Sequence, residues 1–184
     1  MRVITGAARG RRLVTLEGEE VRPTTEKVKE AVFSAIQFEL EGRRFLDLFA
    51  GSGQMGIEAL SRGAADCVFV DFSRQAVGII EENLRHTGLE DRASVLNADA
   101  AKFIRNTAET FDVVFIDPPY GKNLVGAVLP DAVDHTKKTG VIVCETESGA
   151  ELPETVGCFV RDRVKKYGKT GVVIYRVKTE SEET

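Results

Sequence analysis

The chain has 184 residues, a formal net charge of −4, 42% apolar residues and 29% charged residues. This composition is typical of one globular domain with a sizeable core, and it excludes a disordered chain. No apolar run approaches the roughly 18 residues of a membrane helix, and the N-terminus lacks the apolar segment of a signal peptide. Three widely spaced cysteines indicate core packing in a reducing compartment, so we expect a cytoplasmic protein with no metal site.

The charge is distributed unevenly along the chain. Residues 1–16 carry a net charge of +4 and residues 161–178 carry +6, whereas the segment between them is acidic. Basic ends around an acidic centre are typical of a protein with a polyanionic partner. Two solvated strand faces would give the same pattern, so the charge alone leaves both interpretations open.

The first forty residues predict a basic hairpin followed by a helix. Residues 2–6 and 12–16 are β-prone runs, and the arginines in and beside their connection are expected to contact phosphate groups: Arg9, Arg11 and Arg12. An amphipathic helix is predicted over about residues 25–40. Arg22 and Thr24 precede it and would either cap the helix or extend the phosphate contacts.

Apolar runs then alternate with helix-like segments. The predicted strands are 45–50, 67–71, 93–97, 111–116 and 140–144. The predicted helices are 54–62, 73–87, 100–106 and 124–137. Alternation at these lengths predicts a parallel sheet with helices on both faces.

The last third breaks this alternation. Two further β runs, 157–165 and 170–177, are joined by only four residues and must form an antiparallel hairpin. We therefore expect an α/β fold with a mostly parallel sheet of seven strands whose last strand is antiparallel. One domain would span residues 1–178, with an N-terminal extension over 1–40, a core over 43–178 and a disordered tail over 179–184.

A glycine-rich loop joins the first predicted strand to the first predicted helix of the core. Gly51, Gly53 and Gly56 satisfy the G-x-G-x-x-G pattern, and Asp71 ends the next strand. Taken alone, this is the fingerprint of NAD or FAD binding. Asp47 argues against that interpretation, because a pyrophosphate site has no use for a further buried anion, whereas a cationic ligand does.

S-adenosylmethionine carries a sulfonium and an ammonium group and no phosphate, so it suits an acidic loop. Asp47 would hold the ammonium side, Asp71 would accept from the ribose hydroxyls, and Asp99 would accept from the adenine amino group. Phe72 would lie beside the adenine, and the Ala100 amide would donate to its ring. The expected cofactor contacts are Asp47, Ala50, Gly51, Gly53, Asp71, Phe72, Asp99 and Ala100.

The fourth predicted strand ends in a stiff polar corner, where we expect the chemistry. The apolar run 113–116 is followed by Asp117, Pro118, Pro119 and Tyr120, and the prolines must end the strand. An unpaired base could stack on Tyr120. Its exocyclic amine could donate to the Asp117 carboxylate and to the Pro118 carbonyl, which would orient the amine for in-line attack on a methyl group.

These motifs together resemble a known family. Asp47…Gly51-x-Gly53, Asp71, Asp99 and Asp117-Pro-Pro-Tyr resemble the amino-methylating branch of the class I S-adenosylmethionine-dependent methyltransferases, which have a Rossmann-like sheet. Further segments resemble the RsmD-type enzymes within that class: Met1-Arg-Val-Ile-Thr-Gly, Arg22-Pro-Thr-Thr-Glu and Glu58-Ala-Leu-Ser-Arg-Gly.

The resemblance to RsmD-type enzymes covers nearly all of residues 1–177. It implies a guanine-N2 methyltransferase that acts on guanine 966 of 16S rRNA, as a cytoplasmic monomer working on the small ribosomal subunit. The basic N-terminal residues would then be RNA contacts. Three alternatives stay open: an adenine-N6 methyltransferase on DNA or RNA, an NAD-linked oxidoreductase, and a non-catalytic RNA-assembly factor.

Overall fold

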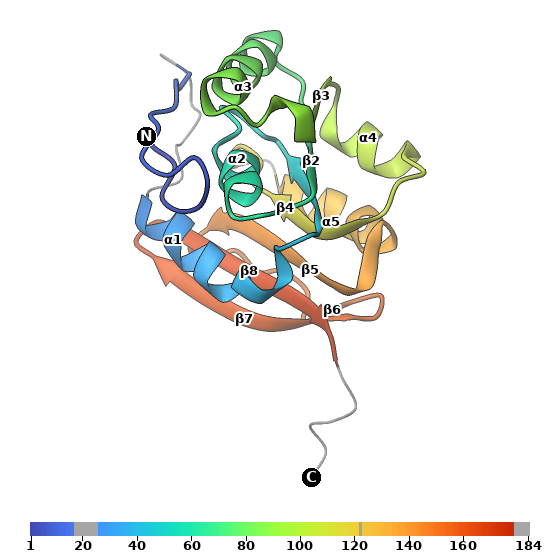
Figure 1. Cartoon of the computed structure of the whole chain (residues 1–184). Helices are drawn as coiled ribbons and strands as arrows, with labels where there is room; N and C mark the ends of the chain where they lie inside the picture. The colour runs from blue at the N-terminus through green and yellow to red at the C-terminus, as the bar shows by residue number, and fades with distance from the viewer. Residues whose placement is uncertain (17–25, 122, 179–184) are drawn as a thin grey trace.

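The computed structural model describes residues 1–16, 26–121 and 123–178, and one eight-stranded sheet forms its centre (Figure 1). The strand order is β3-β2-β1-β4-β5-β8-β7-β6. The parallel strands are β1 (Arg44–Leu48), β2 (Asp66–Asp71), β3 (Ala93–Asn97), β4 (Phe111–Ile116) and β5 (Thr136–Glu147). The antiparallel strands are β8 (Thr170–Val177), β7 (Phe159–Tyr167) and β6 (Thr155–Val156).

Helices cover both faces of the sheet. One face carries α1 (Glu26–Ala35), α2 (Gln54–Ser61) and α3 (Arg74–Thr87), whose apolar residues form what we call the first core layer. The other face carries α4 (Ala100–Asn106) and α5 (Leu124–Asp134), which form the second core layer. Short 3₁₀ turns span Gln37–Glu39 and Glu90–Arg92. None of the described helices is long and apolar enough to cross a membrane.

The structure confirms the predicted fold class. The class was predictable because the central strands are buried on both faces and therefore appear in the sequence as continuous apolar runs. All six residues of β4 are buried, as expected for a strand between two helical layers. The strand order reverses between β1 and β4, which are neighbours in the sheet although β2 follows β1 in the chain. Ligands of open α/β sheets bind at such a switch point, beyond the carboxyl ends of the strands.

The sheet differs from the prediction in its last part. It has eight strands, and three of them, β6, β7 and β8, are antiparallel. The extra strand, β6, has two residues, too few to produce a periodic pattern. The helix predicted to reach residue 137 ends at Asp134, because the Thr136 hydroxyl donates to the Ala132 carbonyl at 2.6 Å and β5 begins there.

The predicted N-terminal hairpin forms, but it is short: the Val3 amide donates to the Arg11 carbonyl at 2.9 Å, and the Leu13 amide donates to the Met1 carbonyl at 3.0 Å. The only bridge in the described part of this segment joins Arg2 and Arg12. Beyond this short pairing, further backbone amides of the segment donate to side chains of the helices: Ile4 and Thr5 to Glu58 and Val14 to Asn83. The helix predicted over 25–40 is α1 followed by the 3₁₀ turn. Arg22, Thr24 and the tail 179–184 lie outside the described residues.

Candidate active site

Four carboxylates lie on one face of the sheet near its carboxyl edge. Strand residues two positions earlier pack in the first core layer: Phe45, Phe69, Phe115 and Val143. Because side chains at i and i+2 share a face, the alternation brings the carboxylates to that same face: Asp47, Asp71, Asp117 and Glu145. Asp99 is not in this row, since it lies beyond β3 as the N-cap of α4.

The loop after β1 has a strained backbone. Phe49 has φ 62°, and the two glycines that follow, Gly51 and Gly53, have φ 56° and 77°. A left-handed conformation in a non-glycine residue costs about 1–3 kcal/mol, and such strain is found at ligand sites. The Gly51 amide donates to Asp71 at 2.9 Å, and the Ala50 amide donates to the Val70 carbonyl at 3.1 Å. The loop is thus held against the end of β2.

Gly56 allows α2 to pack directly on β2. A Cβ atom at this position would come within 2.3 Å of the Phe69 ring and 2.7 Å of the Cys67 sulfur. The short contact distance also brings the Gly56 amide to 2.9 Å from the carboxylate of Asp47, to which it donates. The third glycine of the pattern therefore serves packing, as it does in dinucleotide folds.

Asp47 is buried beneath the loop, with 1% of its surface exposed. Burial raises its pKa from 3.8 to about 8, and the nearby Asp71 carboxylate adds to the rise, while the Gly56 hydrogen bond opposes it. A buried acid of this kind is stabilised in its charged form by a neighbouring cation. A sulfonium and ammonium ligand fits this environment, whereas a pyrophosphate would add a third anion next to two carboxylates.

The remaining predicted cofactor residues lie along the neighbouring strand ends. Asp71 accepts from the Gly51 amide with one oxygen and from the Ser73 amide with the other, both at 2.9 Å. The next residue, Phe72, is 71% exposed, an unusual position for a large aromatic ring and one suited to covering a planar group. Asp99 accepts from the Lys102 amide at 2.8 Å and begins α4, and Ala100 is buried.

The corner after β4 lies next to the glycine loop. The Asp117 amide donates to the carbonyl of Leu48, the last residue of β1, at 3.4 Å. The Tyr120 hydroxyl is 3.3 Å from the Thr170 hydroxyl at the start of β8. Pro118, Pro119 and Tyr120 line a cavity of about 280 Å³ that continues along the end of β5. The corner therefore offers an aromatic ring beside an open space between the residues after β4 and the end of β5.

Glu145 belongs to this site, and the sequence analysis missed it. Cys144 of β5 pairs with Ile116, the last residue of β4, so Glu145 lies within β5 alongside Asp117. It is 3% exposed and lines the same cavity as Tyr120. The signal that identified Asp117, an acid directly after a buried apolar run, was equally present in Val141–Cys144 followed by Glu145.

Of the predicted phosphate contacts, the three described arginines lie in the N-terminal segment beside α2 and α3. Arg9, Arg11 and Arg12 are all exposed, and the Arg11 guanidinium donates to the His86 carbonyl of α3. Among the described residues, no group of three or more His, Cys, Asp or Glu side chains is arranged to hold a metal ion.

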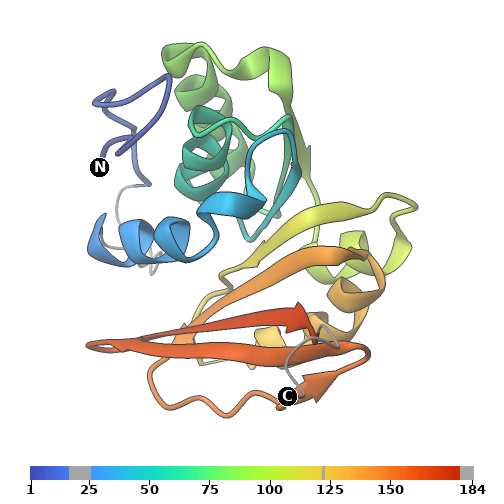
Figure 2. The ribbon, with the colours of Figure 1, turned by 60° about the horizontal axis from the view of Figure 1, so that its bottom comes forward.

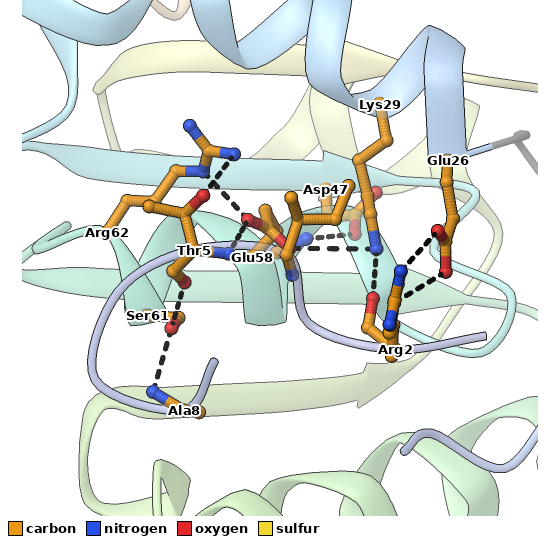
Figure 3. A network of polar contacts seen from close by, with 11 residues as sticks. Arg2, Thr5, Ala8, Glu26, Lys29, Asp47, Glu58, Ser61 and Arg62 are labelled. Carbon is orange, nitrogen blue, oxygen red and sulfur yellow. Dashed lines mark hydrogen bonds and ion pairs between the residues drawn. The ribbon is translucent and has the colours of Figure 1, made fainter. Parts of the chain in front are cut away.

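A buried ion pair anchors this segment, as Figure 3 shows. Glu58 of α2 and Lys29 of α1 are both fully buried and lie 3.6 Å apart. Glu58 also accepts from the amides of Ile4 and Thr5 at 2.8 and 3.0 Å, and Lys29 donates to the Arg2 carbonyl at 2.7 Å. Burial lowers the pKa of Lys29, and the Glu58 carboxylate partly offsets that effect.

Asn83 of α3 links the N-terminal segment to the glycine loop. Its side chain is fully buried, accepts from the Val14 amide at 2.8 Å and donates to the Val14 carbonyl at 2.9 Å. The same amide group donates to the Ser52 carbonyl at 2.9 Å. One side chain thus satisfies backbone groups of both segments, although Val14 and Ser52 are 38 positions apart in the sequence.

The chain was compared with known proteins. The family model described as "Conserved hypothetical protein 95" matches residues 1–176. The Bacillus subtilis protein "Putative rRNA methyltransferase YlbH" is 44% identical over 181 residues, covering 96% of this chain and 98% of that protein. "Ribosomal RNA small subunit methyltransferase D" of Haemophilus influenzae is 33% identical over 184 residues, covering 96% and 92%. A solved structure, "Putative methyltransferase yhhF from Escherichia coli", has a TM-score of 0.85 at 31% identity, covering 97% of this chain and 99% of that one.

Proposed function

The chain belongs to the family described as Conserved hypothetical protein 95, and from this premise we propose that it methylates small-subunit rRNA. The reaction is transfer of a methyl group from S-adenosylmethionine to the exocyclic N2 amine of a guanine, which the resemblance to RsmD-type enzymes identifies as guanine 966 of 16S rRNA. The observation that carries the proposal is the hydrogen bond between the Asp117 amide and the Leu48 carbonyl, because it joins the catalytic corner to the start of the cofactor loop.

The cofactor supplies an electrophilic methyl group on its sulfonium. Asp47 faces the positively charged end of the ligand, and the backbone of Ala50, Gly51 and Gly53 allows close approach. The contacts to the nucleoside come from the neighbouring strand ends. Asp71 accepts from the ribose hydroxyls, Phe72 covers the adenine, Asp99 accepts from its amino group, and the Ala100 amide donates to its ring.

The corner holds the acceptor amine. Tyr120 stacks on the flipped guanine, and Pro119 fixes the ring relative to the strand end. The Asp117 carboxylate and the Pro118 carbonyl accept the two N2 hydrogens, so that the nitrogen lone pair points along the line of transfer. The new bond joins N2 to the methyl carbon while the sulfur–carbon bond breaks, and the surplus N2 proton leaves toward Asp117 or water. Positioning of this kind can contribute about 7 kcal/mol or more to the rate.

Glu145 favours guanine over adenine. The Watson–Crick edge of guanine carries two neighbouring donors, the N1 hydrogen and the N2 amine, whereas adenine carries an acceptor at N1. Asp117, directly after β4, and Glu145, within β5, follow the paired residues Ile116 and Cys144 and provide two neighbouring carboxylate acceptors. Adenine would place its N1 lone pair against a carboxylate. This arrangement supports a guanine substrate and argues against the adenine-N6 alternative.

The N-terminal segment binds RNA phosphates through Arg9, Arg11 and Arg12, which are exposed beside α2 and α3. Arg22 and Thr24, which lie outside the described residues, are proposed as further RNA contacts. The protein works as a monomer in the cytoplasm, where small subunits assemble. The oxidoreductase alternative is disfavoured by the buried acid at Asp47, because a pyrophosphate next to it would disfavour its ionised form, whereas a cationic ligand would stabilise that form.

The test is transfer of labelled methyl from S-adenosylmethionine to unmodified 16S rRNA, free and within small subunits, followed by nucleoside analysis. We expect N2-methylguanine at one position. Asp117→Ala should abolish transfer while binding of S-adenosylhomocysteine survives, and Asp134→Ala on the exposed end of α5 is the matched control. Normal turnover by Asp117→Ala would overturn the assignment of the corner as catalytic. Absence of label from both RNA forms would overturn the assignment of 16S rRNA as the substrate.

A further inference from the structure

A groove outside the active site lies between α1 and the β7–β8 hairpin. Figure 2 shows the hairpin running beneath α1. The groove has a volume of about 270 Å³, and its apolar surface comes from α1 and β8, while β7 supplies its polar side chains. We call it the hairpin groove and use six of its lining residues: Val32, Ala35, Arg163, Lys165, Tyr167 and Val172.

A β-bulge turns the basic residues of β7 into this groove. Arg161 pairs with Tyr175, and Arg163 pairs with Ile174, so one extra residue, Asp162, is inserted between them. Before the bulge, Arg161 lies on the opposite face, where its guanidinium donates to the Leu152 carbonyl at 3.0 Å. After the bulge, Arg163 and the residues two and four positions on share the face of α1. The bulge therefore builds a row of Arg163, Lys165 and Tyr167.

The row leads directly to the catalytic corner. Tyr167 pairs with Thr170, and Thr170 also pairs with Glu147 at the carboxyl end of β5. The Thr170 hydroxyl is 3.3 Å from the hydroxyl of Tyr120. A chain that leaves the corner past Tyr120 therefore meets Tyr167 first, then Lys165 and Arg163.

The chemistry of the groove matches a single-stranded polyanion. Arg163 and Lys165 are exposed cations, Tyr167 offers a half-buried ring, and the described lining residues include no acid. Asp162, the inserted residue of the bulge, is paired with Arg176 and lies 3.5 Å from Arg163. A positively charged track with an aromatic platform is the usual site for unpaired nucleotides, whose phosphates meet the cations while a base stacks on the ring.

We propose that the hairpin groove binds the single-stranded rRNA adjoining the target guanine, with one base on Tyr167 and two phosphates on Lys165 and Arg163. The proposal rests on the proposed function, because a base flipped into the corner obliges its neighbours to leave along an unpaired path. It adds to that function a second RNA surface, separate from the N-terminal arginines.

The test compares binding of a labelled ten-nucleotide single-stranded RNA and a ten-base-pair RNA duplex by fluorescence anisotropy across a salt series. The variant is Arg163→Gln/Lys165→Gln, and the matched control is Lys102→Gln/Lys138→Gln, which removes the same charge from exposed lysines on α4 and at the start of β5. We expect the groove variant to bind the single strand about tenfold more weakly. Its slope of log affinity against log salt should fall by about 1.4, from two phosphates at about 0.7 each.

Tyr167 provides a second, charge-neutral variant. Tyr167→Phe keeps the ring and should bind the single strand as the wild type does, while Tyr167→Leu should lose about tenfold. Both variants are checked for folding by S-adenosylhomocysteine binding, which should stay unchanged. In rRNA methylation, the groove variants should raise KM for rRNA and leave kcat within about twofold.

The outcomes separate the two proposals. An unchanged affinity and salt slope in Arg163→Gln/Lys165→Gln would overturn the proposal that the groove binds single-stranded RNA. An equal loss of affinity in the lysine control, or a loss confined to the duplex, would overturn it too. A wild type that binds the single strand through the groove yet transfers no methyl to rRNA would uphold the groove and overturn the proposed function.

Discussion

At the scale of single residues, Asp47 makes ligand binding depend on pH. Its folded pKa of about 8 lies above the ordinary 3.8, so between these values the folded protein keeps a proton that the unfolded chain releases. The contribution of Asp47 to stability therefore falls as pH rises from about 4 to 8. A cationic ligand needs the ionised form, so its binding must release that proton.

We expect the affinity for S-adenosylhomocysteine, which keeps the ammonium group, to rise toward tenfold per unit between pH 6 and 8 and to level off above 8. Asp47→Asn should bind more weakly, with a flatter pH profile, because its side-chain oxygen can still accept from the Gly56 amide. Calorimetry in two buffers of different ionisation enthalpy measures the released proton. A wild-type profile as flat as that of Asp47→Asn would contradict the placement of the cation.

Glu145 gives a second residue-scale prediction. Glu145→Gln keeps the shape of the side chain and removes the charge that disfavours adenine. We expect kcat/KM for the guanine substrate to fall about tenfold or more, because a hydrogen bond to a charged acceptor is worth about 1.5–3 kcal/mol. Methylation of an RNA with adenine at the target position, undetectable with the wild type, should become measurable. Glu90→Gln, at an exposed position in the 3₁₀ turn Glu90–Arg92 and outside the residues that line the cavity, is the control.

At the scale of elements, the N-terminal segment is anchored by the buried ion pair of Glu58 and Lys29, which no local sequence pattern predicts. Glu58 accepts from two backbone amides and from Arg62 at 2.8 Å, and it forms an ion pair with Lys29 at 3.6 Å. Removing one partner of a buried pair costs about 3–5 kcal/mol. The segment carries the basic side chains of the proposed RNA surface, so its anchoring is a matter of function as well as stability.

Glu58→Gln should lower the free energy of unfolding by about 3 kcal/mol, measured by urea denaturation. Lys29→Met should cost less, because Glu58 keeps Arg62 and both backbone amides, while the buried methionine needs no partner. Glu81→Gln, on the exposed side of α3, should stay within about 0.5 kcal/mol. Equal losses of unfolding free energy in Glu58→Gln and Glu81→Gln would contradict the conclusion that the Glu58–Lys29 pair anchors this segment.

The same elements explain which features the sequence could predict. The parallel strands were predictable because burial on both faces leaves runs such as Val113–Ile116, and the glycine loop because its backbone needs residues without a side chain. The contacts of the buried charges were not predictable from the sequence, because Glu58 and Ile4 are 54 positions apart and only the folded chain brings them together. The N-terminal hairpin was predicted, but its short length was not, since distant side chains satisfy the backbone amides of Ile4, Thr5 and Val14.

At the scale of the whole molecule, the cofactor loop and the N-terminal segment are held by one side chain. Asn83 makes three hydrogen bonds, two to Val14 and one to Ser52, from a position with no exposed surface. A shift of either segment therefore breaks bonds to the other. Ligands that order the two segments should favour each other, because each would fix the contact that the other requires.

We expect the wild type to bind S-adenosylhomocysteine more tightly when 16S rRNA is present, by about fivefold or more, the lower end of ordinary coupling. Asn83→Leu keeps the volume and removes all three bonds, so both affinities should fall and the coupling should vanish. The control is Asn106→Leu, because the Asn106 side-chain amide donates to the Lys102 carbonyl within α4. This variant should keep the coupling between the two ligands. A variant that binds each ligand more weakly yet retains the full coupling would mean that the two sites communicate through another part of the fold.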